Sequence, residues 1–329
     1  MPSVAVLVLN YNGEPFIEAC LKSVLAQDHD LREVLVIDNG STDRSAEIVK
    51  RDFPGVRLLE TGANLGFAAG MNLGIDRTDA ELLLLLNTDV VLAPAFVRGL
   101  VDALADRSDV GSAAGKVYRL GEGSGTIIDT TGHVIFKNRL FIDRGDGEVD
   151  VGQYDKQEEI FGPCAGIGMY RRSMLDDIKI DNEYFDASFF LFLEDTDLNW
   201  RAQLRGWKSV YVPWAHAWHV RGGVAVRRSR VVELHNYKNR YMMLIKNDTP
   251  LSALMNLHHF LITDSLKSFG VLWRSPGALL GWLDVWRNLP SLLRKRRIIQ
   301  RSRKVSPADF EQWFARFDYG RWIRHHLRG

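Results

Sequence analysis

The chain has 329 residues, of which 46% are hydrophobic and 25% charged, and its formal net charge is +1. These values are ordinary for a globular protein with one large domain or two smaller ones, and the near-neutral charge argues against a general nucleic-acid binder. Two cysteines, Cys20 and Cys164, are too few for a disulfide framework, so we expect free thiols in a reducing compartment. Because the N-terminus lacks the basic start of a signal peptide and no apolar run reaches the roughly 18 residues of a membrane span, we expect a cytoplasmic protein.

Strand patterns alternate with helix patterns through the first 90 residues. The expected strands are residues 3–9, 33–37, 56–60 and 82–86, and each is followed by polar or turn-forming residues. Between them, apolar residues at helical spacing predict helices that end near Leu25, Asp52 and Ile75. This alternation predicts an α/β fold with a mostly parallel, doubly wound sheet.

The most apolar strand pattern, Leu82–Leu86, consists of five leucines and stops at Asn87-Thr88-Asp89. Such a run is typical of a strand buried on both faces. Ligands of open α/β sheets bind beyond the carboxyl ends of the strands, so Asp89 is well placed for a metal or phosphate site. Asp89 could equally cap a helix that begins near Pro94, and this stretch alone does not decide between the two interpretations.

The middle of the chain is less regular. A helix is expected from Pro94 to Ala105 and a strand from Val110 to Val117, whereas residues 119–159 are expected to form an irregular functional loop or mobile lid. The small residues of 161–168 suit close approach by a ligand. An aromatic stretch at 185–193 leads into Glu194-Asp195, a helix from Asp197 to about Arg205 and a short strand at 210–212, and the sequence places His216 and His219 in the loop that follows.

The composition changes beyond about Val231. His235–Lys246 is expected to be helical, and residues 251–285 mix Leu, Phe and Trp with scattered charges. The segment Arg287–Lys304 carries eight basic residues and no acid. Basic helices beside aromatic, leucine-rich ones suit an anionic membrane surface, but a helical extension packed on the sheet domain is the alternative. We place a domain boundary at 245, with a helical C-terminal extension over 246–329.

Five motifs together resemble family 2 glycosyltransferases, which are inverting nucleotide-sugar enzymes with the GT-A fold. They are NYNG (10–13), DNGSTD (38–43), NLGFAAGMNLGI (64–75), NTD (87–89) and FFLFLEDTDLNWRAQLRGW (189–207). The resemblance covers roughly residues 3–245, and the motifs occur in the family's order. The most similar members are rhamnosyltransferase-like bacterial enzymes that build cell-surface polysaccharides.

The resemblance implies a divalent cation, Mg²⁺ or Mn²⁺, that stabilises the charge growing on the leaving diphosphate. Asp89 matches the metal-binding acid of the family's DXD-type motif, although Asn87 stands where that motif has its first Asp. His219 matches a position that often adds a ligand. His216 is the rival ligand, and His219 is preferred because two glycines, Gly222 and Gly223, follow it.

Asp38 resembles the residue that reads the base. A carboxylate accepts a hydrogen bond from the N3–H of uracil or thymine, which cytosine lacks, so UDP- or dTDP-sugars are favoured over CMP-sugars. The resemblance implies that five further residues line the nucleotide pocket: Asn10, Asn64, Gly66, Asn72 and Asn87.

Asp195 resembles the catalytic base, which removes the proton of an acceptor hydroxyl in a single displacement with inversion. Glu194 would orient the acceptor or the start of the helix. Arg240 and Lys238 are possible diphosphate contacts. Phe189, Phe190 and Phe192 are expected to be core residues.

These inferences predict an inverting glycosyltransferase that moves a sugar, with rhamnose as the candidate, to a lipid-linked or polysaccharide acceptor. A peripheral contact at the inner face of the cytoplasmic membrane is a further expectation. A nucleotidyltransferase would be expected to show a glycine-rich, lysine-bearing phosphate loop near the first strand, and a dinucleotide-binding oxidoreductase a G-x-G-x-x-G; neither follows that strand. A catalytically inactive envelope-assembly module would more readily have lost an acid at 89 or 195, and both are present.

Overall fold

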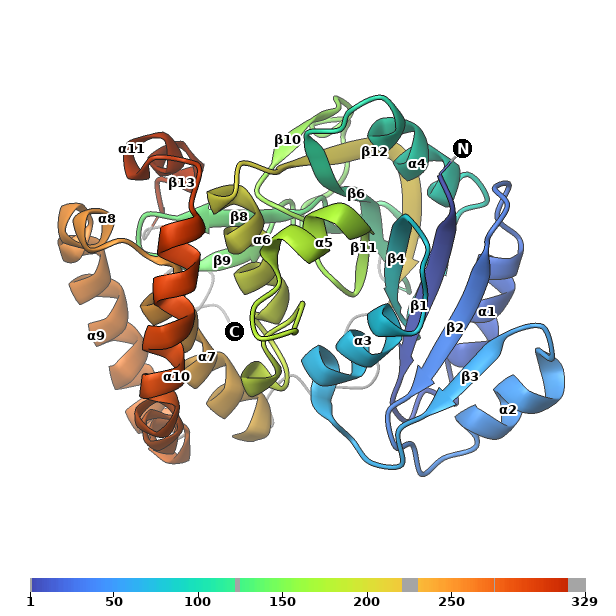
Figure 1. The fold of residues 1–329 in the computed structure, drawn as a ribbon, viewed down its shortest axis with the longest axis horizontal. Helices are drawn as coiled ribbons and strands as arrows, with labels where there is room; N and C mark the ends of the chain where they lie inside the picture. The colour runs from blue at the N-terminus through green and yellow to red at the C-terminus, as the bar shows by residue number, and fades with distance from the viewer. Residues whose placement is uncertain (1, 122–124, 221–229, 275, 319–329) are drawn as a thin grey trace.

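The structure, a computed structural model, describes residues 2–121, 125–220, 230–274 and 276–318. A central sheet is covered on both faces by helices, and a layer of longer helices lies against one end of it (Figure 1). In spatial order the sheet contains β10 (Glu158–Ile160), β12 (Lys208–His219), β6 (Val110–Arg119), β11 (Ile167–Arg171), β4 (Leu82–Asn87), β1 (Val4–Asn10), β2 (Glu33–Asp38) and β3 (Arg57–Glu60), with β5 (Val90–Leu92) paired to β12 and β7 (Ile128–Thr130) paired to β6. The run β4-β1-β2-β3 is parallel, which confirms the predicted fold class.

Alternation along the strands divides the sheet's apolar side chains between two cores. Leu82, Leu84 and Leu86 face one core, and Leu83 and Leu85 face the other, all with no exposed surface. The helices around the sheet are α1 (Ile17–Leu25), α2 (Ser45–Asp52), α3 (Gly66–Asp76), α4 (Phe96–Ala105), α5 (Arg172–Ile178) and α6 (Glu194–Leu204). The leucine run is therefore the doubly buried strand that its composition predicts.

Strand register brings the predicted polar residues to one edge. Asn10 pairs with Asp38 across β1 and β2, and Leu9 pairs with Asn87 across β1 and β4. The three carboxyl ends therefore lie side by side. Asp89 follows two residues after the end of β4, so it lies at this edge as well.

Two features of the middle segment differ from the sequence expectations. His216 and His219 lie within β12, because this strand resumes pairing with β6 after an irregularity between Val212 and His216 and also pairs with β5. Residues 119–159 are not wholly irregular, since they contain β7, β8 (His133–Phe136), β9 (Phe141–Asp143) and most of β10. The side chain of Lys116, 2% exposed, binds Asp150 and Asp155 at 2.9 and 2.6 Å and ties this segment to β6.

The C-terminal helices share a core with the sheet domain. They are α7 (Arg230–Asn247), α8 (Pro250–Met255), α9 (Leu257–Arg274), α10 (Gly281–Ser302) and α11 (Pro307–Phe310), followed by β13 (Phe314–Ala315). The rings of Trp200 and Phe310 stack with centroids 5.8 Å apart, and β13 pairs with β8 in a small sheet of order β13-β8-β9. The boundary proposed at residue 245 falls just inside the end of α7.

Within the described ranges, none of the helices has the length and apolar character that crossing a membrane requires.

A buried ion network fastens the helical layer to the sheet domain. Lys246 of α7 lies 2.5 Å from Asp186 and 2.9 Å from Asp197, and Lys295 of α10 lies 2.8 Å from Asp186. Burial alone would raise the pKa of Asp186, but the two ammonium groups hold it well below its usual range. The network therefore needs all its charges, because a buried charge without its partner is strongly unfavourable.

Lys246→Met should lower the free energy of unfolding by about 3–5 kcal/mol, because it leaves Asp186 and Asp197 short of a buried cation. Chemical denaturation at pH 7 measures this loss. Lys208→Met is the matched control: Lys208 is 44% exposed and pairs with exposed Asp109, so its loss should be below about 1 kcal/mol. The difference in the free energy of unfolding between wild type and Lys246→Met should narrow as the pH falls below about 4. The depressed pKa of Asp186 contributes stability that is fully present above its unfolded pKa and is lost as the pH falls toward its folded pKa. Equal losses in the two variants would contradict a structural role for the network.

Candidate active site

Asp38, at the end of β2, is held by its neighbours in a fixed orientation. The buried amide of Asn10 donates to Asp38 Oδ1 at 2.7 Å and to Ser45 Oγ at 2.8 Å, and the backbone N–H of Ser41 donates to Asp38 Oδ2 at 3.2 Å. Asp38 itself is only 5% exposed. Each oxygen of this carboxylate keeps a lone pair for a ligand.

A second polar turn lies beside Asp38. Asn39, the residue after β2, donates to Asn64 Oδ1 at 3.1 Å, and the N–H of Gly66 donates to the same oxygen at 2.9 Å. Gly66 has φ +80°, and a Cβ there would lie 2.4 Å from the carbonyl oxygen of Phe190, so only glycine fits. The structure thus brings Asn64 and Gly66 to the edge that holds Asp38.

Asn72 has a different set of contacts from the one expected of a nucleotide ligand. Its Nδ2 donates to the carbonyl of Phe185 at 2.8 Å, and its Oδ1 accepts the N–H of Phe185 at 2.9 Å. Both ends of the amide thus position the aromatic stretch that precedes α6.

Asp89 and His219 lie together, with a third acid behind them. His219 Nε2 is 3.4 Å from Asp89 Oδ2, and His219 Nδ1 is 2.8 Å from Asp129 Oδ2. A carboxylate at 2.8 Å accepts the Nδ1–H, so Nε2 is the nitrogen directed toward Asp89. Burial alone would lower the pKa of His219, but Asp129 and Asp89 raise it to about 10.

This arrangement fits a divalent cation. The 3.4 Å between His219 Nε2 and Asp89 Oδ2 matches two neighbouring ligands of one ion, each about 2.1 Å from it. Metal-binding histidines usually donate their other N–H to a carboxylate, as His219 does to Asp129. His216, the rival ligand, packs its ring edge-on against Tyr118 instead. Gly222 and Gly223, which favoured His219 in the sequence, lie outside the described residues.

Asp195 is connected to the end of β4 through two consecutive residues. The N–H of Ala165 donates to Asp195 Oδ2 at 3.2 Å, and the carbonyl of Gly166 accepts the N–H of Asn87 at 2.8 Å. A Cβ on Gly166 would lie 2.7 Å from the Asn87 amide nitrogen, so a larger residue there would displace the Asn87 side chain. Asp195 and Asn87 thus lie on either side of one short backbone segment.

The chain enters α6 through a strained loop. Phe190, Phe192 and Leu193 have φ between 64° and 69°, values that side chains other than glycine rarely adopt. The amide of Asn239 in α7 donates to the carbonyls of Phe189, Leu191 and Phe192 at 2.8–3.0 Å. Strain of this kind persists only where the surroundings hold it, and it concentrates at functional sites.

The three phenylalanines expected in the core differ in position. Phe189 is fully buried, whereas Phe190 is half-buried and stacks on His235 with centroids 5.2 Å apart. Phe192 is also half-buried. Only Phe189 is thus a core residue in the full sense.

Glu194 begins α6 with a buried carboxyl group. It is 5% exposed, and its Oε2 atom has no hydrogen-bond partner within the described residues. Burial, and then the charge of Asp195, raise the pKa of Glu194 well above its usual value. The Oε2 atom of Glu194 therefore has hydrogen-bonding capacity left over.

Another cluster near Asp195 contains His133, Asp143 and Cys164, whose ligand atoms lie within 4.8 Å of one another. Asn199 Nδ2 donates to the carbonyl of Pro163 at 2.8 Å, which fixes its orientation, and it also lies 3.3 Å from His133 Nδ1. With His133 Nδ1 accepting this bond, its Nε2 carries the proton in this arrangement, and a cation there would have to displace it.

The proton on His133 Nε2 faces carboxylates instead of a metal. This nitrogen lies 3.7 Å from Asp195 Oδ2 and 3.7 Å from Asp143 Oδ1. Burial, and then the charge of Asp195, raise the pKa of Cys164 well above its usual value, so the thiol keeps its proton and is a poor ligand. Of the two clusters, Asp89 with His219 offers the better ligand atoms for a cation, a carboxylate oxygen and a ring nitrogen.

Two basic residues named as diphosphate contacts have other partners. Arg240 is 3% exposed and donates to the carbonyls of Asn138 and Arg139 and to Asp264. Lys238 is 7% exposed and donates to the carbonyl of Ser188 at 3.4 Å. These contacts hold α7 against its neighbours.

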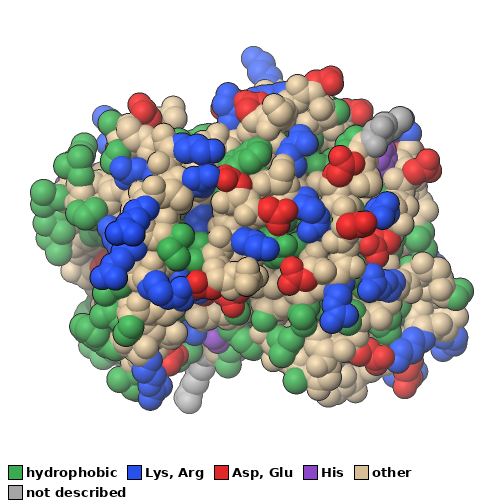
Figure 2. Space-filling view, viewed as in Figure 1, with side chains coloured by type: hydrophobic (Ala, Val, Ile, Leu, Met, Phe, Trp, Pro, Cys, Tyr) green, Lys and Arg blue, Asp and Glu red, His purple; other side chains and the backbone are tan. Residues whose placement is uncertain are grey.

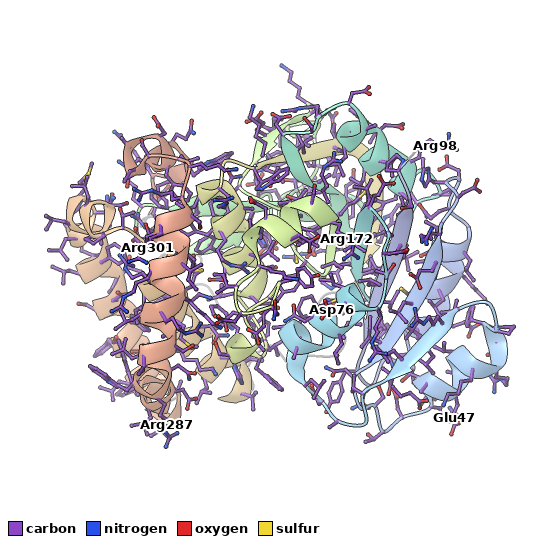
Figure 3. The ribbon with its side chains drawn as sticks, viewed as in Figure 1. Glu47, Asp76, Arg98, Arg172, Arg287 and Arg301 are labelled. Carbon is purple, nitrogen blue, oxygen red and sulfur yellow. The ribbon has the colours of Figure 1, made fainter. Side chains whose placement is uncertain are left out.

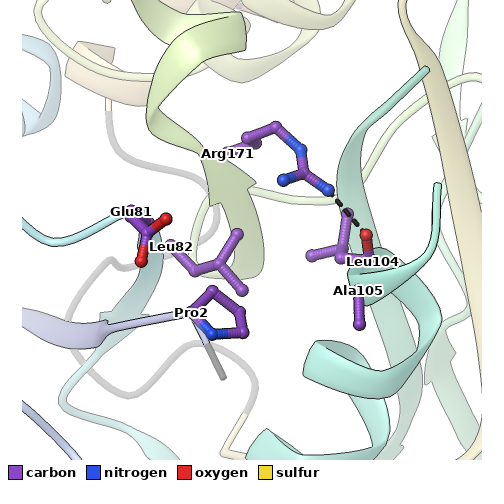
Figure 4. A pocket seen from close by; sticks show the side chains of 6 residues that line it. All are labelled: Pro2, Glu81, Leu82, Leu104, Ala105 and Arg171. Atoms are coloured by element: carbon purple, nitrogen blue, oxygen red, sulfur yellow. Dashed lines mark hydrogen bonds between the residues drawn. The ribbon is translucent and has the colours of Figure 1, made fainter. Parts of the chain in front are cut away.

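A pocket of about 350 Å³ lies at the opposite, amino-terminal edge of the sheet (Figure 4). Its lining includes Pro2, Leu82 and Arg171, and the guanidinium of Arg171 is occupied by the carbonyl of Leu104 at 2.6 Å. Ligands of α/β sheets bind at the carboxyl edge, so this pocket is not the candidate site.

Sequence reasoning missed Asp129, His133 and Asn239. Asp129 and His133 come from the segment expected to be irregular, where no periodicity marks a site. The only sequence signal was the residue types themselves, an acid and a histidine among glycines. Asn239 lies within a helical pattern, and nothing local distinguishes a loop-binding amide from a surface one.

Comparison with known proteins gives a family match. The model described as Glycosyl transferase family 2 matches residues 5–179. The N-acetylglucosaminyl-diphospho-decaprenol L-rhamnosyltransferase of Mycobacterium tuberculosis is 29% identical over 268 residues, which cover 73% of this chain and 83% of that protein.

Two solved structures share the fold. The mannosyltransferase PcManGT from Pyrobaculum calidifontis, in complex with GDP-Man and Mn²⁺, has a TM-score of 0.53 at 17% identity and covers 92% of this chain and 86% of its own. GalNAc-T7 with UDP, GalNAc and Mn²⁺ has a TM-score of 0.58 at 13% identity and covers 75% of this chain, which spans about half (48%) of that one. At these identities the likeness concerns the fold.

Asp129→Asn should weaken Mn²⁺ binding about 10- to 100-fold, because the histidine beside Asp89 loses the carboxylate that orients it. Isothermal titration calorimetry or Mn²⁺ EPR measures the affinity without any turnover. Asp143→Asn is the control from the other cluster and should leave the affinity within about twofold of wild type. If only Asp143→Asn weakened Mn²⁺ binding, the cation site would have to be assigned to the cluster that contains His133 and Cys164.

Proposed function

The chain belongs to glycosyl transferase family 2, and from that membership we propose a cation-dependent, inverting transfer of a sugar, with rhamnose the first candidate, from a UDP- or dTDP-sugar to a lipid-linked or polysaccharide acceptor in cell-surface glycan synthesis. The mycobacterial relative, by its name, transfers L-rhamnose to an N-acetylglucosaminyl-diphospho-decaprenol. That relative supports both the sugar and the lipid-linked acceptor.

One observation carries the proposal. Ala165 and Gly166 contact Asp195 on one side and Asn87 on the other, while Asp89, two residues beyond Asn87, faces His219. A base and a cation site are therefore held by the same backbone. This is the arrangement that a displacement between an acceptor hydroxyl and a diphosphate requires.

The donor's base would lie against Asp38. Asn10 and Ser41 donate to the Asp38 carboxylate, which orients it, and its free lone pairs can accept the N3–H of uracil or thymine. Asn64 and Gly66 shape the neighbouring wall. Asn72 supports this wall from behind through its contacts with Phe185.

The transfer step is a single displacement. The acceptor hydroxyl gives its proton to Asp195, its oxygen forms the new bond to the anomeric carbon, and the bond from that carbon to the diphosphate breaks with its electron pair leaving on the nucleotide. N–H groups of Ala165 and Thr196 hold the Asp195 carboxylate in place at 3.2 and 2.7 Å. A divalent cation, Mg²⁺ or Mn²⁺, held by Asp89 and His219 would neutralise the charge on the leaving diphosphate.

Two other residues assist Asp195. His133 Nε2 lies 3.7 Å from Asp195 Oδ2, where it helps to fix the position of the carboxylate as the acceptor approaches. Glu194, whose Oε2 atom has no hydrogen-bond partner within the described residues, would orient the acceptor by hydrogen bonding.

A lipid-linked acceptor would bring the enzyme to the inner face of the cytoplasmic membrane. The C-terminal region would then make a peripheral contact with that surface, to which exposed basic side chains such as Arg287 contribute.

Asp195→Asn should lower kcat by about 10²–10⁴-fold while leaving donor affinity unchanged, because the amide cannot take up the acceptor proton. A radiolabelled transfer assay and a donor titration measure the two quantities. Asp79→Asn, which alters an exposed acid paired with Arg32 at 2.8 Å, serves as the control and should transfer normally. Normal transfer by Asp195→Asn would refute the base assignment.

Thermal unfolding should discriminate among donors. UDP- or dTDP-sugars with Mn²⁺ should raise the Tm of the wild type, by up to the equivalent of about 2.7 kcal/mol at a concentration 100 times Kd, whereas CMP-sugars should not. Asp38→Asn should relax this preference, because an amide can donate to N3 of cytosine. If Asp38→Asn kept the donor preference of the wild type, the assignment of Asp38 as the residue that contacts the base would be wrong.

A further inference from the structure

Helices α8 and α9 carry their polar side chains inward and their apolar side chains outward. Thr263 is 4% exposed and accepts from Asn138 at 3.0 Å, and Asp264 accepts from Arg240 at 3.0 Å. Asn256, also 4% exposed, donates to Glu311 at 3.3 Å. A helix on the surface of a water-soluble protein normally has the opposite arrangement.

The outward side is mostly apolar, with His258 and Ser265 as exposed polar residues of α9 among the apolar ones. Ile262, Leu266, Phe269 and Trp273 follow at helical spacing and are 48%, 43%, 71% and 82% exposed. The apolar face of α8 and α9 comprises Leu251, Leu254, Met255, Leu257, Leu261, Ile262, Leu266, Phe269, Leu272 and Trp273, each at least 43% exposed. Single exposed apolar residues are ordinary, but a contiguous set of this size marks an interaction surface.

The apolar face continues onto the start of α10. Leu280, Leu283 and Trp286 are 60%, 52% and 65% exposed. Tryptophan is enriched at membrane–water interfaces, where its ring is apolar and its N–H can remain hydrated.

Cations border the apolar face. Arg287 and Arg301, labelled in Figure 3, lie toward the two ends of α10, and both are exposed. Figure 2 shows apolar side chains gathered over α8 and α9 beside a row of Lys and Arg side chains over α10. Not all basic side chains of α10 are available for contacts outside the protein, since Lys295 binds Asp186 and Arg296 donates to the carbonyl of Ile245.

We propose that the apolar face of α8 and α9, with the start of α10, inserts into the interfacial region of a bilayer with anionic headgroups. The polar inward side holds α9 on the protein, so the helix would lie along the membrane plane with only its outer side in the acyl region. A second copy of the chain is the less suitable occupant, because identical rows of cations would meet across such an interface.

This geometry also relates the membrane to the active site. The strands β1, β2 and β3 run downward in Figure 1, so their carboxyl ends point to the lower side of the view, the side on which α9 ends and α10 begins. A lipid-linked acceptor would thus meet the site near the bilayer surface. That last step rests on the proposed function, whereas the insertion itself does not.

Vesicle flotation of the full-length chain tests the insertion without any turnover. The double variant Phe269→Ser with Trp273→Ser should lower partitioning into phosphatidylglycerol-containing vesicles on the order of 100-fold, because two inserted aromatic side chains are lost. The control Trp214→Ser changes a tryptophan that is 53% exposed on β12 and should bind as the wild type does. Binding of the wild type should fall in phosphatidylcholine vesicles, which lack the anionic headgroup.

Unchanged flotation of the double variant would overturn the proposal. The proposal would also be overturned if analytical ultracentrifugation showed a dimer for the wild type and a monomer for the double variant, and neither protein bound vesicles. Transfer to a water-soluble acceptor analogue should be equal in the double variant and the wild type; an inactive wild type with intact vesicle binding would instead contradict the proposed function alone.

Discussion

The candidate site depends on the short backbone segment Ala165–Gly166. Its first residue donates its N–H to Asp195, and its second accepts the N–H of Asn87 through its carbonyl. A Cβ at Gly166 would lie 2.7 Å from the Asn87 amide nitrogen, so glycine at this position lets the Asn87 side chain stay where it is beside the two contacts. A base and a strand end that are far apart in the sequence are thereby fixed relative to each other.

The C-terminal helices belong to this arrangement as much as the sheet does. Asn239 of α7 binds three carbonyls of the strained loop that leads to Asp195, and Lys246 of the same helix is anchored in the buried ion network. The layer that supports the loop also carries the apolar face on its outer side. Support for the base and the proposed membrane contact are thus built into one helical unit.

Much of the fold could be predicted from the sequence, because the sheet follows from local patterns. The leucine run at Leu82–Leu86 and the polar residues after each strand determine both the parallel core and the edge where ligands would lie. Asp129 and His133 could not be predicted, since their positions depend on the pairing of β7 with β6 and of β8 with β9 and β13, which no local pattern signals. The apolar residues of α9 were equally ambiguous, because composition alone does not tell an outward apolar face from a buried one.

The central claim is that Asp38, Asp89, Asp195 and His219 surround one nucleotide-diphosphate and cation site. Anomalous diffraction at the manganese edge, from crystals grown with Mn²⁺ and UDP or dTDP, tests it most directly. The account predicts one manganese peak between Asp89 and His219, with the base of the nucleotide against Asp38 and Asp195 facing the diphosphate. A manganese peak at His133 and Cys164, or a nucleotide bound at the opposite edge of the sheet, would contradict it.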